Sequence, residues 1–266
     1  MILASHGLIA SQIASFDADA VAFFNRVTND GGSLSATEKS AVNQLVLDLK
    51  ANSLWTPMKA IYPMVGASAA ACRQNLKSSS FTGTFTATGW TFASTGVTGN
   101  GLSAYFDTTL TPSVSIASQD SISISYYSRS NISTSVDFGA VSLTPTVIIQ
   151  ASTNDGGDTY FRVNQASSQS NASNGGSALK NYIYNRTSST TEAVFINTTK
   201  TSLSKTSSGN VSQPIYLGSQ NNNGVPQFYS NRQCAMFTIG DGLTDTQASN
   251  FYTAVQAFQT TLSRQV

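Results

Sequence analysis

One polar, aromatic stretch in the last quarter of the sequence has the residue types of a carbohydrate-binding loop. It contains consecutive asparagines, followed closely by a tyrosine and an arginine. Sugar sites combine an aromatic face, on which a ring stacks, with amide and guanidinium groups that bond to hydroxyls. We therefore predict a ligand-binding rim here, with an ordinary loop and a core-facing tyrosine as the alternative. The predicted ligand residues are Asn221, Asn222, Asn223, Tyr229 and Arg232.

Residues 181–186 (NYIYNR) form a second stretch of this composition, with the same alternative. A third candidate site is the run Asn154-Asp-Gly-Gly-Asp158, which places oxygen ligands on a tight loop. Calcium accepts carboxylates and carbonyls in flexible geometry, so Asn154, Asp155 and Asp158 are candidate calcium ligands. The spacing is not that of an EF-hand, and a plain Asp-Gly hairpin is the alternative interpretation.

The residues that catalysis would require are scarce. His6 is the only histidine, and Glu38 and Glu192 are the only glutamates. A glycosidase needs two carboxylates at a set separation, and Glu38 already belongs to a helix-capping pattern. Cys72 and Cys234 are far apart in sequence and can pair or stay reduced; we favour two free thiols. We predict that the protein is not an enzyme.

The composition is neutral, rich in hydroxyls and poor in charge. Of the 266 residues 10% are charged, the formal net charge is +1, and there are 41 Ser and 31 Thr. The hydrophobic share of 40% is nevertheless too large for a disordered polar tract. Because the chain has no basic run, we expect no nucleic-acid partner.

The N-terminal segment Met1–Phe16 lacks the features of a signal peptide. No Lys or Arg precedes Arg26, and polar residues interrupt the apolar run. No stretch approaches the roughly 18 apolar residues that span a bilayer, so we expect no membrane insertion. We expect the protein to be assembled in the cytoplasm. This apolar segment is either a frayed terminus or an anchor that gains order on a neighbouring subunit.

Three helical patterns precede the β region, and a fourth closes the chain. Asp17 can cap a helix over 18–27, and Ser35 with Glu38 forms a capping box before an apolar helical repeat. Thr56-Pro57 predicts a short third turn or helix that carries Met58 and Ile61. A second capping box, Thr244-Asp-Thr-Gln247, precedes a helix whose apolar stripe is expected to pack on the sandwich or on the N-terminal helices, with a subunit contact as the alternative.

From Phe81 onward the hydrophobic period changes from helical to alternating. Residues 121–125 (SISIS) alternate most regularly and predict a strand buried on one face. About a dozen short strands with Gly- and Asn-rich turns between them favour an antiparallel sandwich or jelly roll. The further strands are predicted at 81–85, 90–92, 104–106, 136–138, 146–150, 159–163, 180–184, 192–197, 214–217 and 234–239.

Several segments resemble virion proteins of tailed bacteriophages, of the minor tail, fibre or decoration type. They are residues 47–50 (LDLK), 54–66 (LWTPMKAIYPMVG), 75–77 (NLK), 126–131 (YYSRSN) and 242–259 (GLTDTQASNFYTAVQAFQ). The stretch Thr98-Gly-Asn-Gly-Leu102, with Tyr105 and the strand near 122–127, is similar to the opening of concanavalin A-like (laminin-G-like) sandwiches.

The resemblance implies a concanavalin A-like antiparallel β-sandwich with a small N-terminal helical module and a C-terminal helix. The expected domains are an attachment module at 1–70 and a sandwich at 71–266. The implied role is a structural component of a tailed-phage virion, with other virion proteins and further copies of the chain as partners. The sandwich would bind host-surface glycan, and such folds often carry calcium at loop ends.

Two other classes of function remain alternatives. The first is a stand-alone lectin or adhesin, which differs from the virion protein in needing an export signal. The second is a glycan-cleaving sandwich enzyme, in which Glu192 would be an essential carboxylate.

Overall fold

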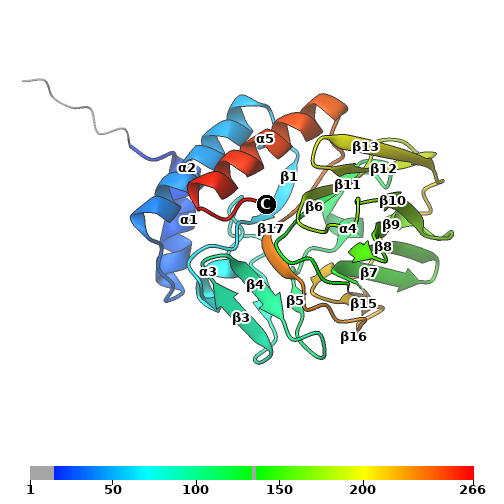
Figure 1. Ribbon diagram of the computed structural model, residues 1–266, viewed down its shortest axis with the longest axis horizontal. Helices are drawn as coiled ribbons and strands as arrows, with labels where there is room; N and C mark the ends of the chain where they lie inside the picture. The colour runs from blue at the N-terminus through cyan, green and yellow to red at the C-terminus, as the bar shows by residue number, and fades with distance from the viewer. Residues whose placement is uncertain (1–14, 134–135) are drawn as a thin grey trace, which may run out of the picture.

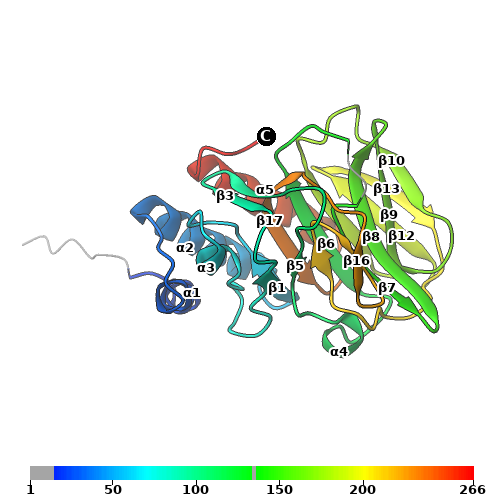
Figure 2. The ribbon, with the colours of Figure 1, turned by 90° about the horizontal axis from the view of Figure 1, so that it is seen from below.

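Two β-sheets packed face to face form the centre of the computed structural model, which describes residues 15–133 and 136–266 (Figures 1 and 2). The predicted anchor at the N-terminus lies, up to residue 14, outside the described residues. Most neighbouring strands run antiparallel, and the parallel pairing of β15 with β7 is the exception. The predicted class, a mainly-β antiparallel sandwich with a C-terminal helix, is confirmed.

The first sheet has eight strands. Seven follow one another in space, and β1 (Met58–Tyr62) adds an eighth by pairing with β17. The spatial order is β13 (Thr199–Ser204), β12 (Thr191–Ile196), β11 (Asn181–Arg186), β6 (Ile122–Ser128), β17 (Gln233–Gly240), β4 (Gly96–Gly99) and β3 (Trp90–Ala93).

The second sheet has nine strands. Its main path is β10 (Ser170–Ser173), β9 (Asp158–Gln165), β8 (Thr146–Asp155), β7 (Phe138–Leu143), β14 (Tyr216–Leu217), β5 (Phe106–Asp107) and β2 (Thr84–Phe85). The hairpin of β15 (Gln220–Asn222) and β16 (Val225–Gln227) joins the same edge of β7 as β14 does.

The three long helices of the described chain begin where the sequence predicts caps, whereas the two four-residue helices were not predicted. The Asp17 side chain accepts from Asp19 N, and both capping boxes, Ser35 with Glu38 and Thr244 with Gln247, are formed. The helices are α1 (Ala18–Asn29), α2 (Ala36–Ala51), α3 (Ala69–Cys72), α4 (Pro112–Ser115) and α5 (Asp245–Thr261).

Two hydrophobic cores share the eight-stranded sheet between them. One fills the space between the sheets, and the other lies between the outer face of the eight-stranded sheet and helices α1, α2 and α5. For this reason β6 is buried along its whole length, whereas its alternation predicted burial on one face. Tyr126 enters the inter-sheet core and Tyr127 enters the helix-side core.

The segment around Met58 differs from its prediction. Thr56 and Pro57 do form a turn, but Met58 and Ile61 lie in strand β1, because pairing with β17 and burial on both faces outweigh local helical spacing. β1 belongs to the main sheet and α2 packs on α5, so residues on both sides of position 70 contribute to the helix-side core.

Candidate functional site

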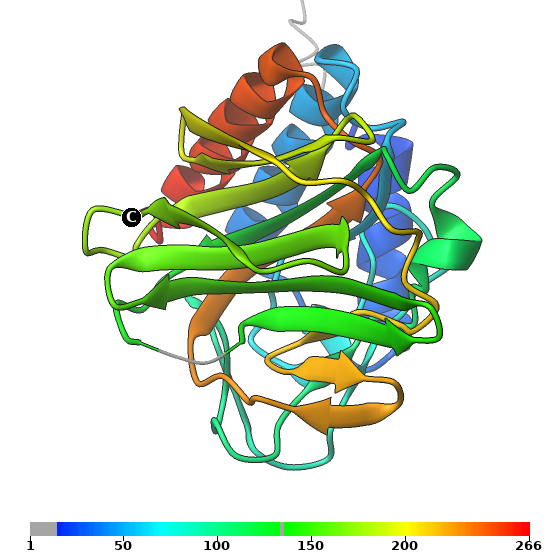
Figure 3. The ribbon, with the colours of Figure 1, turned by 90° about the vertical axis from the view of Figure 1, so that its right-hand side faces the viewer.

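The outer faces of the two sheets differ in what covers them. Helices α2 and α5 lie over the eight-stranded sheet. The nine-stranded sheet presents β7, β8 and β9 outward, as Figure 3 shows with the helices behind the sheets. Polar and aromatic side chains on this open face can therefore meet a ligand without any displacement of a helix.

A groove of about 460 Å³ lies on the open face, and we call it the sheet groove. Aliphatic side chains alternate in it with amides, a guanidinium, a carboxylate and an aromatic ring, a mixture typical of small-ligand sites. The groove is lined by Val136, Val141, Ile148, Gln150, Asp155, Arg162, Gln169, Gln220, Asn222 and Phe228.

Gly139 on β7 brings two amides of the groove together. Its register partners include Gln150 on β8 and Gln220 on β15, and these amides meet across β7, where Gln220 Nε2 donates to Gln150 Oε1 at 2.6 Å. A Cβ on Gly139 would lie 3.0 Å from Gln150 Cβ and 2.8 Å from Ile149 O. Whichever way the amides are assigned, the pair retains one NH₂ and one C=O for hydroxyls of a ligand.

Phe228 supplies the aromatic surface of the groove. Its side chain is 54% exposed, and no other aromatic residue of the described chain is as exposed. Its backbone φ of 56° is in the left-handed region, which costs a bulky residue on the order of 1–3 kcal/mol. Hydrogen bonds of the adjacent residues hold this conformation, because Ser230 N donates to Gly218 O and Tyr229 Oη donates to Pro226 O.

Arg162 on β9 lies directly beside Gln150 in the register of the sheet. Its Nε donates to Ser167 O at 2.9 Å, which fixes the guanidinium plane against the β9–β10 loop. Burial lowers the pKa of Arg162 from its usual value, and the Glu192 carboxylate counteracts this shift. A guanidinium remains charged at neutral pH under such a shift.

The polar row continues across the open face beyond the groove. Gly139 also pairs with Tyr216 on β14, and Tyr216 pairs with Asp107 on β5. Tyr216 stacks on Tyr105 with ring centroids 4.6 Å apart, and burial raises its pKa to about 12. Burial likewise raises the pKa of Asp107, whose carboxylate accepts from Thr109 N.

Of the five predicted ligand residues, Asn222 lines the sheet groove. Asn221 is buried and holds the β15–β16 hairpin, since its side chain donates to Pro214 O and accepts from Gly224 N. Asn223 is exposed in the hairpin turn, at a φ of 51°, and accepts from Gln213. Tyr229 is half-buried against Pro226.

Arg232 has an internal role in place of the predicted one. Its side chain is fully buried, with Nε 3.0 Å from a carboxylate oxygen of Asp137. Its terminal nitrogens donate to the carbonyls of Ser130 and Ile132. A buried guanidinium needs this full set of acceptors, so Arg232 is not a surface ligand residue.

The second predicted stretch and the candidate catalytic glutamate are also internal. Tyr182 and Tyr184 face the inter-sheet core, and Arg186 is buried with Glu192. The Glu192 carboxylate is saturated, because Val163 N, the side chains of Gln165 and Ser170, and the guanidinium of Arg186 all donate to it. Such a group has no lone pair left for general acid–base work.

The candidate calcium ligands lie at the β8–β9 hairpin. The Asn154 side chain is buried, and its Oδ1 accepts from Gly157 N and Asn174 Nδ2. Asp155 and Asp158 face each other in the register, and Asp158 accepts from Asn171. The residues thus form the hairpin of the alternative interpretation, and the described chain contains no cluster of three or more metal-ligating His, Cys, Asp or Glu side chains.

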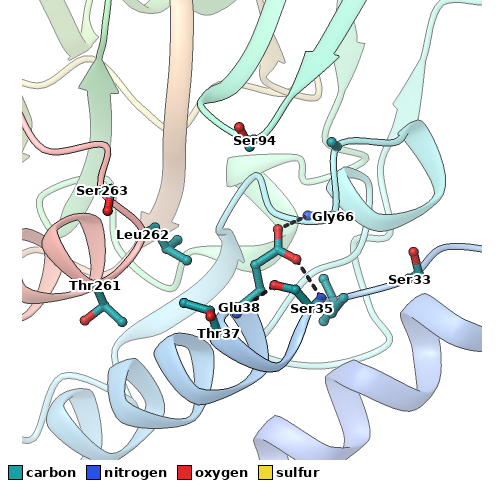
Figure 4. Close-up of a pocket in the computed structure, with 11 residues that line it drawn as sticks. Ser33, Ser35, Thr37, Glu38, Gly66, Ser94, Thr261, Leu262 and Ser263 are labelled. Atoms are coloured by element: carbon teal, nitrogen blue, oxygen red, sulfur yellow. Dashed lines mark hydrogen bonds between the residues drawn. The ribbon is translucent and has the colours of Figure 1, made fainter.

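A larger cleft of about 630 Å³ lies elsewhere, where the start of α2 meets the end of α5 (Figure 4). Hydroxyls line it, and Glu38 is the one titratable group among its lining residues. The two Glu38 oxygens accept from Ser35 N and Gly66 N, at 2.8 and 2.7 Å. Glu38 therefore joins α2 to the Gly66 turn, and both of its oxygens already take part in this structural role.

The two cysteines are free and buried, as favoured from the sequence. Burial raises the pKa of the Cys72 thiol to about 12, so it is an unreactive thiol at neutral pH.

Among the helices that the structure describes, none has the length and apolar character of a membrane-spanning segment.

The sequence did not identify Gln150, Arg162, Gln220 and Phe228 as site residues. Gln150 and Arg162 carried a usable signal, because each is the polar outward residue between inward apolar neighbours in a strand. Their meeting point depends on sheet order and register, which no local pattern specifies.

No protein-family model and no curated protein matches the chain. Among solved structures it is similar to domain 4 of AbnA, a GH43 extracellular arabinanase from Geobacillus stearothermophilus, determined with arabinotriose. That likeness has 15% identity and a TM-score of 0.46 and covers 73% of this chain and 97% of the other.

Two further similar structures belong to longer proteins. The sialidase of Trypanosoma rangeli, determined with sialic acid, has 9% identity and a TM-score of 0.49 over 79% of this chain and 38% of the sialidase. Domains LG4-5 of the mouse laminin alpha1 chain have 17% identity and a TM-score of 0.37, over 48% of this chain and 37% of theirs. The chain thus spans less than two fifths of these proteins, and likenesses at this level bring it no ligand or activity.

Proposed function

We propose that this protein binds glycans without cleaving them and that the sheet groove is the binding site. The observation that carries the proposal is Phe228, an exposed ring held at a left-handed backbone position beside a bed of paired amides. Strained conformations of this kind persist where the surrounding structure maintains them, often at ligand sites.

The groove offers both components of sugar recognition. The exposed ring of Phe228 provides an apolar face for the C–H groups of a pyranose. Asn222 and the Gln150–Gln220 pair provide donors and acceptors for hydroxyls at fixed positions. A shallow site on an open sheet face also admits an internal segment of a polysaccharide as well as its end.

The non-catalytic part of the proposal rests on the carboxylates. Among the described residues that line the groove, Asp155 is the one carboxylate, whereas glycoside hydrolysis by the usual mechanisms uses two. Glu192 lies beneath the sheet with its oxygens saturated. The groove therefore has a means of holding a sugar and lacks an acid–base pair.

The setting that we propose for this binding is the surface of a tailed-phage particle. Its support is the resemblance of the N- and C-terminal segments to virion proteins, with no contribution from the geometry. Many copies on one particle would convert a weak groove into firm attachment through multivalency. Mass spectrometry of purified particles from a host that carries the gene tests this setting; absence of the chain from the particles would refute it and leave the binding proposal intact.

A glycan array tests the binding itself. We expect the wild-type chain to bind a defined set of glycans and Phe228→Ala to lose about five- to thirtyfold in affinity, because stacking on one ring contributes on the order of 1–2 kcal/mol. Phe16→Ala is the matched control, since Phe16 is the other exposed phenylalanine and lies beside Phe24 of α1. Binding that survives Phe228→Ala unchanged would refute the site, and hydrolysis of an array glycan would refute the non-catalytic role.

A further inference from the structure

We propose that the sheet groove selects glycans that carry a carboxylate and that Arg162 is the residue that receives it. This inference rests on the proposed glycan-binding function and adds the chemical class of the ligand. It follows from the orientation of one guanidinium, the charges around it and the polarity of the groove.

The guanidinium of Arg162 is held in one orientation, and some of its N–H donors remain open to a ligand. Its Nε is occupied by Ser167 O, and neither terminal nitrogen takes part in a hydrogen bond or ion pair within the part of the chain that the structure describes. A guanidinium whose plane is fixed and whose two terminal nitrogens are open matches the two oxygens of a carboxylate. The contact with Ser167 thus prepares Arg162 for a bidentate partner.

The charges around Arg162 leave this end of the groove positive. Glu192, the carboxylate that counteracts the lowering of the Arg162 pKa, is buried and already pairs with Arg186. One negative charge is therefore shared between two guanidinium groups. Lys205 adds a further cation, because its Nζ donates to Ser168 O and Oγ in the same β9–β10 loop.

Partial burial of Arg162 makes its interaction with a ligand carboxylate stronger than it would be at an open surface. Arg162 is half-buried and partly stripped of water, which is the cause of its lowered pKa. An incoming carboxylate would compensate this desolvation, and hydrogen bonds between ionised groups are stronger than those between neutral groups.

The charge of the lining side chains differs between the two ends of the groove. Asp155 lines it too, but lies five residues from Gln150 along β8, on the order of 15 Å away in an extended strand. An anionic group is therefore favoured beside Arg162 and disfavoured toward Asp155. The expected ligand is an acidic oligosaccharide that lies along β8 with its carboxylate at Arg162 and neutral sugar toward the hairpin.

The test is an array of matched pairs, in which uronic- and sialic-acid glycans are printed beside their methyl-esterified or neutral counterparts. We expect the wild type to prefer the acidic members. Titration calorimetry with the best acidic member should then show a loss of about tenfold or more for Arg162→Gln. Affinity for the neutral counterpart should stay unchanged in that variant.

Two further variants make the result specific. Arg162→Lys keeps the charge without the planar fork, so we expect it to recover part of the acidic preference. Lys200→Gln removes one exposed cation outside the groove and should behave as wild type. Thermal unfolding checks that each variant is folded.

The outcomes separate the two proposals. Equal binding of acidic and neutral members by the wild type, or an acidic preference that persists in Arg162→Gln, overturns the role of Arg162 while the groove remains a glycan site. Absence of binding to any printed glycan overturns the proposed function, and this inference with it.

Discussion

The two outer faces of the sandwich are built from the same kind of alternating strand and have opposite fates. On the eight-stranded sheet the outward side chains include Tyr127, Ile183 and Phe195, which helices α2 and α5 and their neighbours bury. On the nine-stranded sheet the outward row includes Gln150, Arg162 and Tyr216 and has no helical cover. The outer face of the eight-stranded sheet is therefore part of a hydrophobic core, whereas the outer face of the nine-stranded sheet is accessible to a ligand.

This division changes how composition is interpreted. A chain with 10% charged residues and many hydroxyls could place its polar groups anywhere on the surface. The structure collects apolar side chains under the helices, so that an aromatic residue left exposed, such as Phe228, stands out. Substitutions on the two faces should accordingly separate stability from binding.

The largest effect should come from the buried pair that joins the two sheets. Asp137 precedes β7 and Arg232 precedes β17, and both side chains are fully buried. Arg232→Ala should lower the free energy of unfolding by about 4 kcal/mol, because it leaves a carboxylate buried without its cation. Chemical denaturation measures this loss. The control Lys200→Ala breaks an exposed pair and should cost less than about 1 kcal/mol; a similar small cost for Arg232→Ala would show that the buried pair does not hold the sheets together.

On the helix-covered face, Phe251→Ala should lower the free energy of unfolding by about 3 kcal/mol. Phe251 on α5 is completely buried in the helix-side core, so its removal leaves a cavity. Glycan affinity of the folded variant should remain at the wild-type value, because the groove lies on the other sheet. A parallel loss of affinity at a temperature where the variant is folded would contradict the separation of the two faces.

At the centre of the open face, Gly139→Ala should cost about 1–2 kcal/mol of stability and also abolish binding. The added Cβ meets Ile149 O and Gln150 Cβ, which strains β7 and forces the Gln150–Gln220 pair apart. Denaturation and calorimetry on one preparation measure both effects. Unchanged affinity in this variant would mean that the amide pair takes no part in the site.

The smallest effect concerns Asp107, at the far end of the polar row. Burial raises the folded-state pKa of this carboxyl, so its ionised form destabilises the fold at neutral pH. Asp107→Asn keeps the acceptor for Thr109 N and should be more stable than wild type at neutral pH, by less than about 1 kcal/mol given screening by water.

This advantage should shrink as the pH falls. The wild type regains stability relative to the variant as Asp107 protonates, that is, as the pH falls through its folded-state pKa toward the ordinary value near 4. Unfolding curves of both proteins at a series of pH values give the difference directly. A difference that grows on acidification would reverse the assigned sign of the pKa shift.

Local chemistry was sufficient to predict the three long helices, α1, α2 and α5, and most of the strands. The capping boxes at Ser35 and Thr244 depend on residues three apart, so the sequence contains them whole. Strand β1 was not predicted, because its partner, β17, lies about 180 residues later and nothing near Met58 encodes that pairing.

The candidate site was predicted in part, for the same physical reason. The polar stretch that contains Asn221 and Arg232 was identified, and one of its five predicted ligand residues, Asn222, does line the groove. Arg232 was assigned wrongly because a solvent-facing and a buried guanidinium look alike until Asp137 is placed beside it. Gln150 and Arg162 come from strands whose order defines the groove, which is a property of the assembled sheet.

The most direct test of a binding site on the open face is an NMR titration of the isotope-labelled wild-type chain with the strongest glycan from the array. We expect the largest shifts at the side-chain amides of Gln150 and Gln220 and at the backbone of Gly139 and Phe228, with α2 and α5 unaffected. Shifts concentrated instead on the helices, or around the cleft at Glu38, would contradict the assignment of recognition to the nine-stranded sheet.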